Sequence, residues 1–179
     1  TKGRTVTAEV IALPDFKDSL SFRAWLPSVK GKYVMVSMPQ PTGRPDHNWK
    51  EYGTAESILK MNNDRDSLAK AWDRRMQSTG LSINSIPGVL EEAGAVGVVT
   101  SFWSREFGAN KIFGARTHLV PTIDISLEDY GTLYRLAEKG IKPKIAVETA
   151  SKDLGNVPAF NTIAEIKGVE FPDEYVILS

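Results

Sequence analysis

The sequence predicts an α+β fold in which a twisted, partly barrel-like sheet carries two or three short helices. One observation is a helix, a glycine and a buried strand in succession from Ile86 to Thr100. Another is that four further strand-like stretches begin near Thr5, Tyr33, Val120 and Lys144. With 179 residues, 41% of them hydrophobic, the chain is long enough to bury one sizeable core.

The amino-terminal part alternates between strand and turn patterns. Thr5 to Leu13 alternates and is rich in β-branched residues, which predicts a first strand. Ser19 to Trp25 suits a turn of helix, and Tyr33 to Met38 suits a central strand. Thr42 to Gly53 has turn chemistry without a period, so we interpret it as a surface loop.

Two helices are expected next. Thr54 can cap a short helix that reaches Met61, and residues 62–64, Asn-Asn-Asp, interrupt it. A better helix runs from about Arg65 to Ser78. Leu68, Trp72 and Met76 recur every four residues in it, which places them on one buried face.

The stretch from Ile86 to Thr100 should form the core of the fold. Pro87 fits the first turn of a helix, and Gly94 can adopt the left-handed conformation that ends one. The following run Val-Gly-Val-Val, residues 96–99, lacks polar alternation and is typical of a strand covered on both faces. We interpret Glu91 and Glu92 as solvated charges on the outer face of the helix.

A long segment without a clear period, residues 101–119, follows this core. Such a length favours either a hairpin or a functional loop. A short strand from Val120 to Ile125 then leads to a helix that is capped by Ser126 and ended by Gly140. Lys144 to Thr149 supplies another strand.

The carboxyl-terminal part has a different character, so we place a boundary after residue 150. Ser151 to Pro158 is a polar linker, and Thr162 to Lys167 and Tyr175 to Leu178 are expected to form a hairpin. Because the last expected strand runs into Ser179 without a polar tail, we expect the chain to be a piece of a longer one.

Composition argues against several classes of function. Lysine and arginine total 22, as do aspartate and glutamate, so no net positive field favours nucleic acid. No apolar run approaches the ~20 residues that span a bilayer. The chain contains no cysteine, which removes disulfides, thiolate nucleophiles and cysteine-bound zinc.

No standard catalytic or metal-binding motif is present. The sequence lacks a G-x-S-x-G elbow, a phosphate-binding P-loop, a G-x-G-x-x-G fingerprint and an H-E-x-x-H zinc motif. Its two histidines, His47 and His118, are far apart in sequence. We therefore assign no catalytic residue and no metal ligand.

The long segment nevertheless carries residues suited to contacts with another molecule. Aromatic, basic and amide side chains occur together in it: Trp103, Arg105, Phe107, Asn110 and His118. We expect a loop that packs on a neighbouring domain, or in a sharper form a lid that faces substrate.

Three segments together resemble a known arrangement. GVLEEAGAVGVVT (88–100) resembles the helix-then-strand signature of protease-associated domains. VPTIDISLEDYGTLYRLAEKGIKPKIAVET (120–149) is similar to the second half of such a domain, and FNTIAEIKGVEFPDEYVILS (160–179) to the hairpin that re-enters the catalytic domain in zinc exopeptidases of the carboxypeptidase Q type.

The resemblance implies a swivelling protease-associated domain over residues 1–150, with 151–179 as the linker and hairpin at the start of a zinc peptidase domain. In that family a His-x-Asp zinc-binding pair follows the strand that matches Tyr175 to Ser179, so zinc is expected outside this chain. The resemblance implies a non-catalytic accessory domain of a secreted or periplasmic aminopeptidase or dipeptidase. Its expected partners are its own catalytic domain, the peptide substrate and, as one arrangement, a second copy of the chain.

A second hypothesis is a self-contained small-ligand enzyme of α/β type. His118 precedes a strand and Asp124 lies six residues on, so the two could form a catalytic pair. Arg105 would complete a pocket around them.

Overall fold

The computed structural model describes residues 3, 5–112, 114–151, 155–166, 168–171 and 174. The chain divides into two units, Lys2–Ala150 and Ser151–Ser179. Among the described residues, the helices and strands all belong to the first unit.

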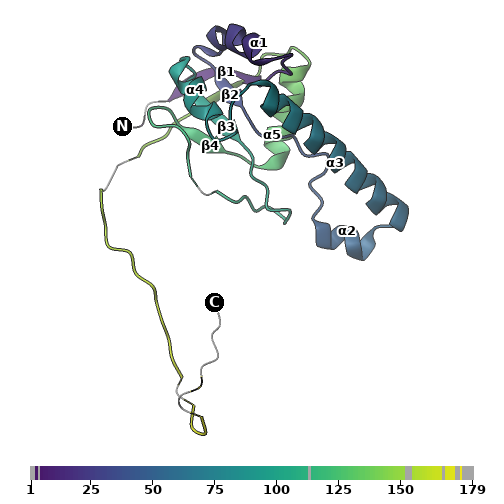
Figure 1. The fold of residues 1–179 in the computed structure, drawn as a ribbon, viewed down its shortest axis with the longest axis vertical. Helices are drawn as coiled ribbons and strands as arrows, with labels where there is room; N and C mark the ends of the chain where they lie inside the picture. Colours follow the sequence, from purple (N-terminus) through teal and green to yellow (C-terminus); the bar gives the residue numbers. More distant parts are fainter. Residues whose placement is uncertain are drawn as a thin grey trace. The chain divides into compact units, whose positions relative to one another are not determined.

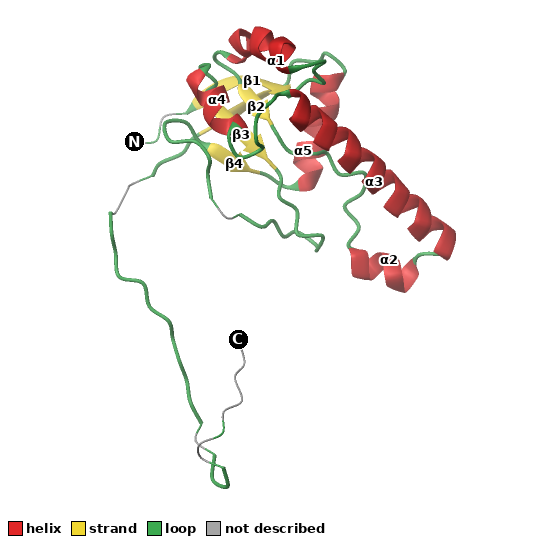
Figure 2. Ribbon diagram, in the orientation of Figure 1, coloured by secondary structure: helices red, strands yellow, loops and turns green. Residues whose placement is uncertain are grey.

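A single five-stranded sheet organises the first unit (Figure 1). Its strands are β1 (Val6–Ala12), β2 (Tyr33–Met35), β3 (Gly97–Thr100), β4 (Thr122–Asp124) and β5 (Lys144–Val147). Their order is β4-β3-β2-β1-β5, and the first four run parallel while β5 pairs antiparallel with β1. The predicted α+β class and curled sheet are therefore confirmed, as are the positions of these five strands, and the structure adds that the sheet is mixed (Figure 2).

The middle of the sheet is closely packed. Every residue of β2 and β3 is buried, as their unbroken apolar runs predict. Gly97 is required there, because a Cβ at this position would lie 2.7 Å from Cε1 of the Tyr33 ring. The Tyr33 hydroxyl donates to the carbonyl of Val6 at 3.0 Å, which ties β2 to β1.

Three helices with the predicted ends surround this sheet (Figure 2). Helix α1 (Ser19–Trp25) is capped by Asp18 and continues into the 3₁₀ helix η1 (Leu26–Val29). Helix α4 (Ile86–Glu92) ends before Gly94, which has a φ of 91°. In α5 (Leu127–Glu138) the Ser126 hydroxyl accepts a hydrogen bond from the N–H of Asp129, as expected of a cap.

The expectation of two or three short helices is wrong, because the described residues contain five α-helices. The segment interpreted as a surface loop holds α2 (Asp46–Tyr52). Helix α3 (Ala55–Ser78) is one helix of 24 residues, with no break at residues 62–64.

The continuity of α3 has a clear physical cause. Met61, Arg65, Trp72 and Met76 are buried along one stripe, so packing outweighs the weak helix propensity of the two asparagines. Leu68, which we expected on the buried face, is 37% exposed.

The second unit has no regular structure in its described residues, 151, 155–166, 168–171 and 174. The strand predicted from Thr162 onward does not form over residues 162–166, which are exposed. A lone strand without a partner is not stable in water, which explains the difference. The strand predicted over 175–178 lies outside the described residues.

A buried tyrosine joins α5 to the end of β2. The Tyr130 hydroxyl donates to the carbonyl of Ser37 at 2.6 Å and accepts from the N–H of the same residue at 2.8 Å. The Ser37 hydroxyl in turn accepts from the N–H of Ser101 at 3.0 Å, just after β3. Burial of its side chain strongly raises the pKa of Tyr130, so the group stays neutral.

Replacing Tyr130 with phenylalanine is expected to lower the free energy of unfolding by about 2–3 kcal/mol. The change leaves the buried N–H and carbonyl of Ser37 without this partner, and each unsatisfied group is costly. Urea denaturation at neutral pH measures the loss. Tyr52→Phe is the control, because Tyr52 is 64% exposed and should change stability by less than about 0.5 kcal/mol. Equal stability of the two variants would contradict this assignment.

Candidate functional site

A pocket of about 590 Å³ lies where β2 and β3 end. The carboxyl ends of parallel strands are where open α/β sheets usually bind ligands. Its apolar walls come from separate parts of the chain: Met38, Trp72, Ile83, Pro87, Phe102 and Trp103. Its polar lining includes Gln40, Asn84, Ser101, Lys111 and Arg116.

The loop over residues 102–111 forms one side of this pocket and has the shape of an irregular hairpin. Trp103 and Asn110 form an antiparallel bridge, and the N–H of Lys111 donates to the carbonyl of Phe102 at 2.7 Å. The Trp103 indole N–H donates to the carbonyl of Glu106 at 2.7 Å, which holds the turn. The prediction offered a hairpin or a functional loop for residues 101–119, and the backbone of 102–111 forms a hairpin.

Asp124, at the end of β4, anchors the base of the loop. Its carboxylate accepts from the Thr100 hydroxyl at 2.9 Å and from the N–H of Phe102 at 3.0 Å. The Asn110 amide donates to the same carboxylate and, at 2.8 Å, to the carbonyl of Ile125. Asp124 is therefore engaged in holding the loop.

Asp46 holds the outer part of the loop against the helices. Its carboxylate pairs with Arg65 of α3 and, at 3.4 Å, with Arg105 of the loop. Partial burial by itself would raise the pKa of Asp46, but the two guanidinium groups outweigh it and lower that pKa. The carboxylate thus remains charged between two cations that come from different parts of the chain.

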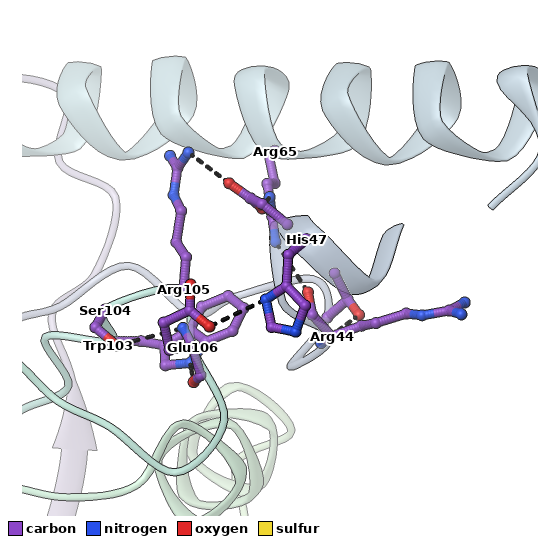
Figure 3. Close-up of polar contacts among 9 residues, drawn as sticks. Arg44, His47, Arg65, Trp103, Ser104, Arg105 and Glu106 are labelled. Atoms are coloured by element: carbon purple, nitrogen blue, oxygen red, sulfur yellow. Dashed lines mark hydrogen bonds and ion pairs between the residues drawn. The ribbon is translucent and has the colours of Figure 1, made fainter. Parts of the chain in front are cut away.

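Of the two arginines that pair with Asp46, Arg65 is the more buried, with 8% of its surface exposed. Its guanidinium lies 5.6 Å from the centre of the Trp103 ring, a cation–π distance. Its Nε is buried without a hydrogen-bond partner. Figure 3 shows the Arg105 side chain extending from the loop toward the helix that carries Arg65, and the Glu106 side chain pointing toward His47.

His47 of α2 makes a second contact with the hairpin, and this contact is exposed to solvent. His47 Nδ1 is 3.1 Å from the Glu106 carboxylate, and the His47 ring packs edge-on against Phe107 at 5.9 Å. Both side chains are more than half exposed, so this contact contributes little free energy.

The structure brings four of the five predicted loop residues together. Trp103, Arg105, Phe107 and Asn110 all lie in the hairpin, and each contacts a residue outside it. His118 lies elsewhere: it precedes β4, whereas Asp124 ends that strand.

The catalytic trio of the second hypothesis is not assembled. Asp124 binds the base of the loop, Arg105 pairs with Asp46, and the backbone N–H of His118 donates to Glu91 at 3.1 Å. The small-ligand enzyme built on these three residues is therefore not supported.

The interpretation of Glu91 as a solvated charge is wrong, because its carboxylate is hydrogen-bonded to the backbone. It accepts the backbone N–H groups of His118, Leu119 and Val120, at distances from 2.5 to 3.1 Å. Desolvation alone would raise the pKa of Glu91, but these N–H donors and the nearby His118 lower it overall. Glu91 fastens the segment before β4 to α4.

Sequence patterns missed Asp46, Arg65 and the role of Glu91. One signal was present for Arg65, which lies on the same helical stripe as Met61, Trp72 and Met76. A cation on an apolar stripe indicates a buried partner. No local pattern indicates the partners of Asp46 or Glu91, because those partners are distant from them in sequence.

Neither a metal cluster nor a membrane-spanning helix occurs in the part of the chain that the structure describes. No three His, Asp or Glu side chains there are grouped so that they could hold a metal ion. None of its helices is long and apolar enough to cross a bilayer.

Comparison with known proteins relates the chain to a peptidase. It is 32% identical to mouse Carboxypeptidase Q over 174 residues, which are 97% of this chain and 30% of the mouse protein. It is 37% identical to human Carboxypeptidase Q over 60 residues, or 34% of this chain and 13% of the human protein. These similarities support a relationship to that peptidase family. The chain spans less than a third of the mouse protein.

Two further comparisons were negative. No family model matches the chain, and no solved structure matches it.

Replacing Glu91 with glutamine is expected to destabilise the fold at neutral pH by about 1 kcal/mol, with a smaller effect in acid. Since folding lowers the pKa of Glu91, its stabilisation is present above the unfolded pKa of about 4.3 and is lost as pH falls through the lower folded value. Denaturation of both proteins from pH 7 to pH 3 measures the gap. Glu92→Gln, on the exposed neighbour, should show no such gap. A gap for Glu91→Gln that stays constant with pH would contradict the assignment.

Replacing Asp46 with alanine is expected to cost about 1–3 kcal/mol of stability and to loosen the hairpin. The change leaves the buried Arg65 without its carboxylate, although partial exposure of Asp46 reduces the loss. Faster amide exchange over residues 102–111 would accompany it. The control is Asp64→Ala, which breaks the exposed pair with Lys60 and should cost under about 0.5 kcal/mol. Unchanged exchange in the hairpin would show that Asp46 does not hold it.

Proposed function

We propose that this chain is a non-catalytic accessory domain of a zinc exopeptidase of the aminopeptidase or dipeptidase type. The observation that carries the proposal is the similarity to mouse Carboxypeptidase Q, which extends over 97% of this chain but only 30% of that protein. In this proposal the peptide-cleaving residues lie elsewhere in a longer protein.

Residues 1–150 form the accessory domain in this proposal, of protease-associated type, and 151–179 lead into the peptidase domain. The α+β fold with a curled mixed sheet is compatible with this assignment. The second unit exposes apolar side chains at Phe160, Ile163 and Ile166, each by 87% or more. Such a segment suits pairing with another part of a larger protein.

The hairpin over 102–111 is the surface we assign to gating or docking. It carries Phe102 and Phe107, which are 48% and 67% exposed. Its outer part is held by the ion pair between Arg105 and Asp46. Exposed aromatic side chains beside a pocket are typical of a surface that meets a partner or a peptide. The hairpin therefore controls access of peptides to the catalytic domain or contacts that domain directly.

Zinc belongs to the catalytic domain in this proposal. The described residues offer no group of three metal-binding side chains, so they do not fit a zinc site and no step of catalysis is assigned to them. By the same family resemblance, we propose that the parent protein is secreted or periplasmic and that copies of it can pair.

The test compares the 179-residue chain with the full-length protein from which it derives. Zinc content and dipeptide hydrolysis are expected only for the full-length protein. Zinc binding with hydrolysis by the 179-residue chain would overturn the proposal, and so would a full-length protein without peptidase activity.

The Asp46→Ala change in the full-length protein tests the gating role. We expect altered kcat/KM for dipeptides with unchanged zinc content, because the hairpin acts on access and not on the metal. Asp64→Ala is again the control. Identical kinetics of the two variants and the parent would contradict gating by the hairpin.

A further inference from the structure

We propose that the pocket at the ends of β2 and β3 binds the C-terminal residue of a peptide, with an apolar side chain inside and its carboxylate paired with Lys111 and Arg116. The choice of a peptide rests on the proposed function. The apolar and anionic character of the ligand rests on the pocket itself.

The size and the walls of the pocket suit the end of a peptide that carries a large apolar side chain. Its volume of about 590 Å³ lies within the range of small-molecule sites. Trp72, Phe102 and Trp103 supply aromatic surface, while Ile83 and Pro87 supply aliphatic surface. Ile83 and Phe102 are 56% and 48% exposed, so a ligand there would remove apolar surface from water.

The charges of the pocket favour an anion. Lys111 and Arg116 both line it, whereas no aspartate or glutamate does. Neither cation forms an ion pair within the described part of the chain, in contrast to Arg65 and Arg105. Because the chain as a whole has no net charge, two unneutralised cations at one pocket are a local feature. Lysine and arginine bind carboxylates and phosphates through charge-assisted hydrogen bonds, and the C-terminus of a peptide supplies a carboxylate.

Ser101 adds a polar group to the lining. It is 7% exposed, and its hydroxyl is buried without a hydrogen-bond partner. Buried hydroxyl groups without partners are uncommon, so this one calls for an explanation. A rotation about its Cα–Cβ bond would let the hydroxyl donate to the carbonyl or carboxylate of a bound residue. Its backbone is already fixed, because the N–H of Ser101 donates to the Ser37 hydroxyl.

The hairpin couples this pocket to the surface assigned to gating. Phe102, Trp103 and Lys111 belong to the hairpin and also line the pocket. Trp103 is in addition the ring that faces the guanidinium of Arg65. Occupation of the pocket therefore acts on the same residues that hold the hairpin against α3.

The experiment titrates the 179-residue chain with three probes and follows amide NMR shifts. The probes are the tripeptide Gly-Gly-Phe, its C-terminal amide, and 3-phenylpropionate, which is an apolar acid without a peptide. We expect Gly-Gly-Phe to bind at least ten-fold more tightly than either other probe, with shifts at Phe102, Ser101 and Lys111. Equal binding of the amide would overturn the role of the carboxylate, and equal binding of phenylpropionate would overturn the choice of a peptide.

Matched variants locate the site. Lys111→Gln with Arg116→Gln should weaken Gly-Gly-Phe at least ten-fold, and Ser101→Ala should weaken it several-fold. Lys50→Gln with Lys70→Gln removes two charges from residues that do not line the pocket and should leave binding unchanged. Equal affinity of the two double variants would overturn the proposed site.

This experiment is independent of peptidase activity. A chain that fails to bind Gly-Gly-Phe, while the full-length protein still requires its other domain for zinc and hydrolysis, would overturn the pocket assignment alone. A chain that binds the peptide while the full-length protein lacks peptidase activity would overturn the accessory role and leave the binding site standing.

Discussion

The buried hydrogen bonds from Tyr130 through Ser37 to Ser101 are the interaction on which the candidate site depends. They join α5 to the ends of β2 and β3 at the level where these two strands stop pairing and the pocket begins. Inside a protein such bonds are stronger than in water, and an unpaired member is costly. The floor of the pocket is therefore rigid, while its wall is a hairpin held mainly by ion pairs and single hydrogen bonds.

The wall of the pocket shows how a chain without net charge can still separate its charges. Asp46 pairs with the buried Arg65 and with Arg105, and Glu91 accepts backbone N–H groups of the segment before β4. These acids are thus used to hold the structure together, whereas the pocket is lined by the cations Lys111 and Arg116. A protein of zero net charge can in this way present a positive site without attracting polyanions over its whole surface.

The fold was more accessible from the sequence than the site. Strands such as Tyr33–Met35 and Gly97–Thr100 lie within short apolar runs, and the predicted cap at Ser126 acts on a residue three positions along the chain. Local rules suffice for such features.

The same rules failed for α3, because the burial that keeps it continuous through residues 62–64 depends on distant parts of the fold. They also failed for the hairpin's partners, since Asp46 and Arg105 are 59 residues apart and no periodicity links them. Aromatic and basic composition located the loop, but only the three-dimensional contacts separate residues that hold it from residues that remain free to bind.

The pairing of β1 with β5 has a consequence for a longer polypeptide. Val6, near the start of the first unit, lies opposite Val147, near its end, and the Thr5 hydroxyl donates to the Glu148 carboxylate at 3.2 Å. Paired residues on neighbouring strands are separated by only about 5 Å. The two ends of the unit therefore lie side by side, so inserting it between two neighbouring residues of a longer protein separates those residues very little. Joining it to a host at those points adds little closure entropy, and its stability can be tuned separately from that of the protein around it.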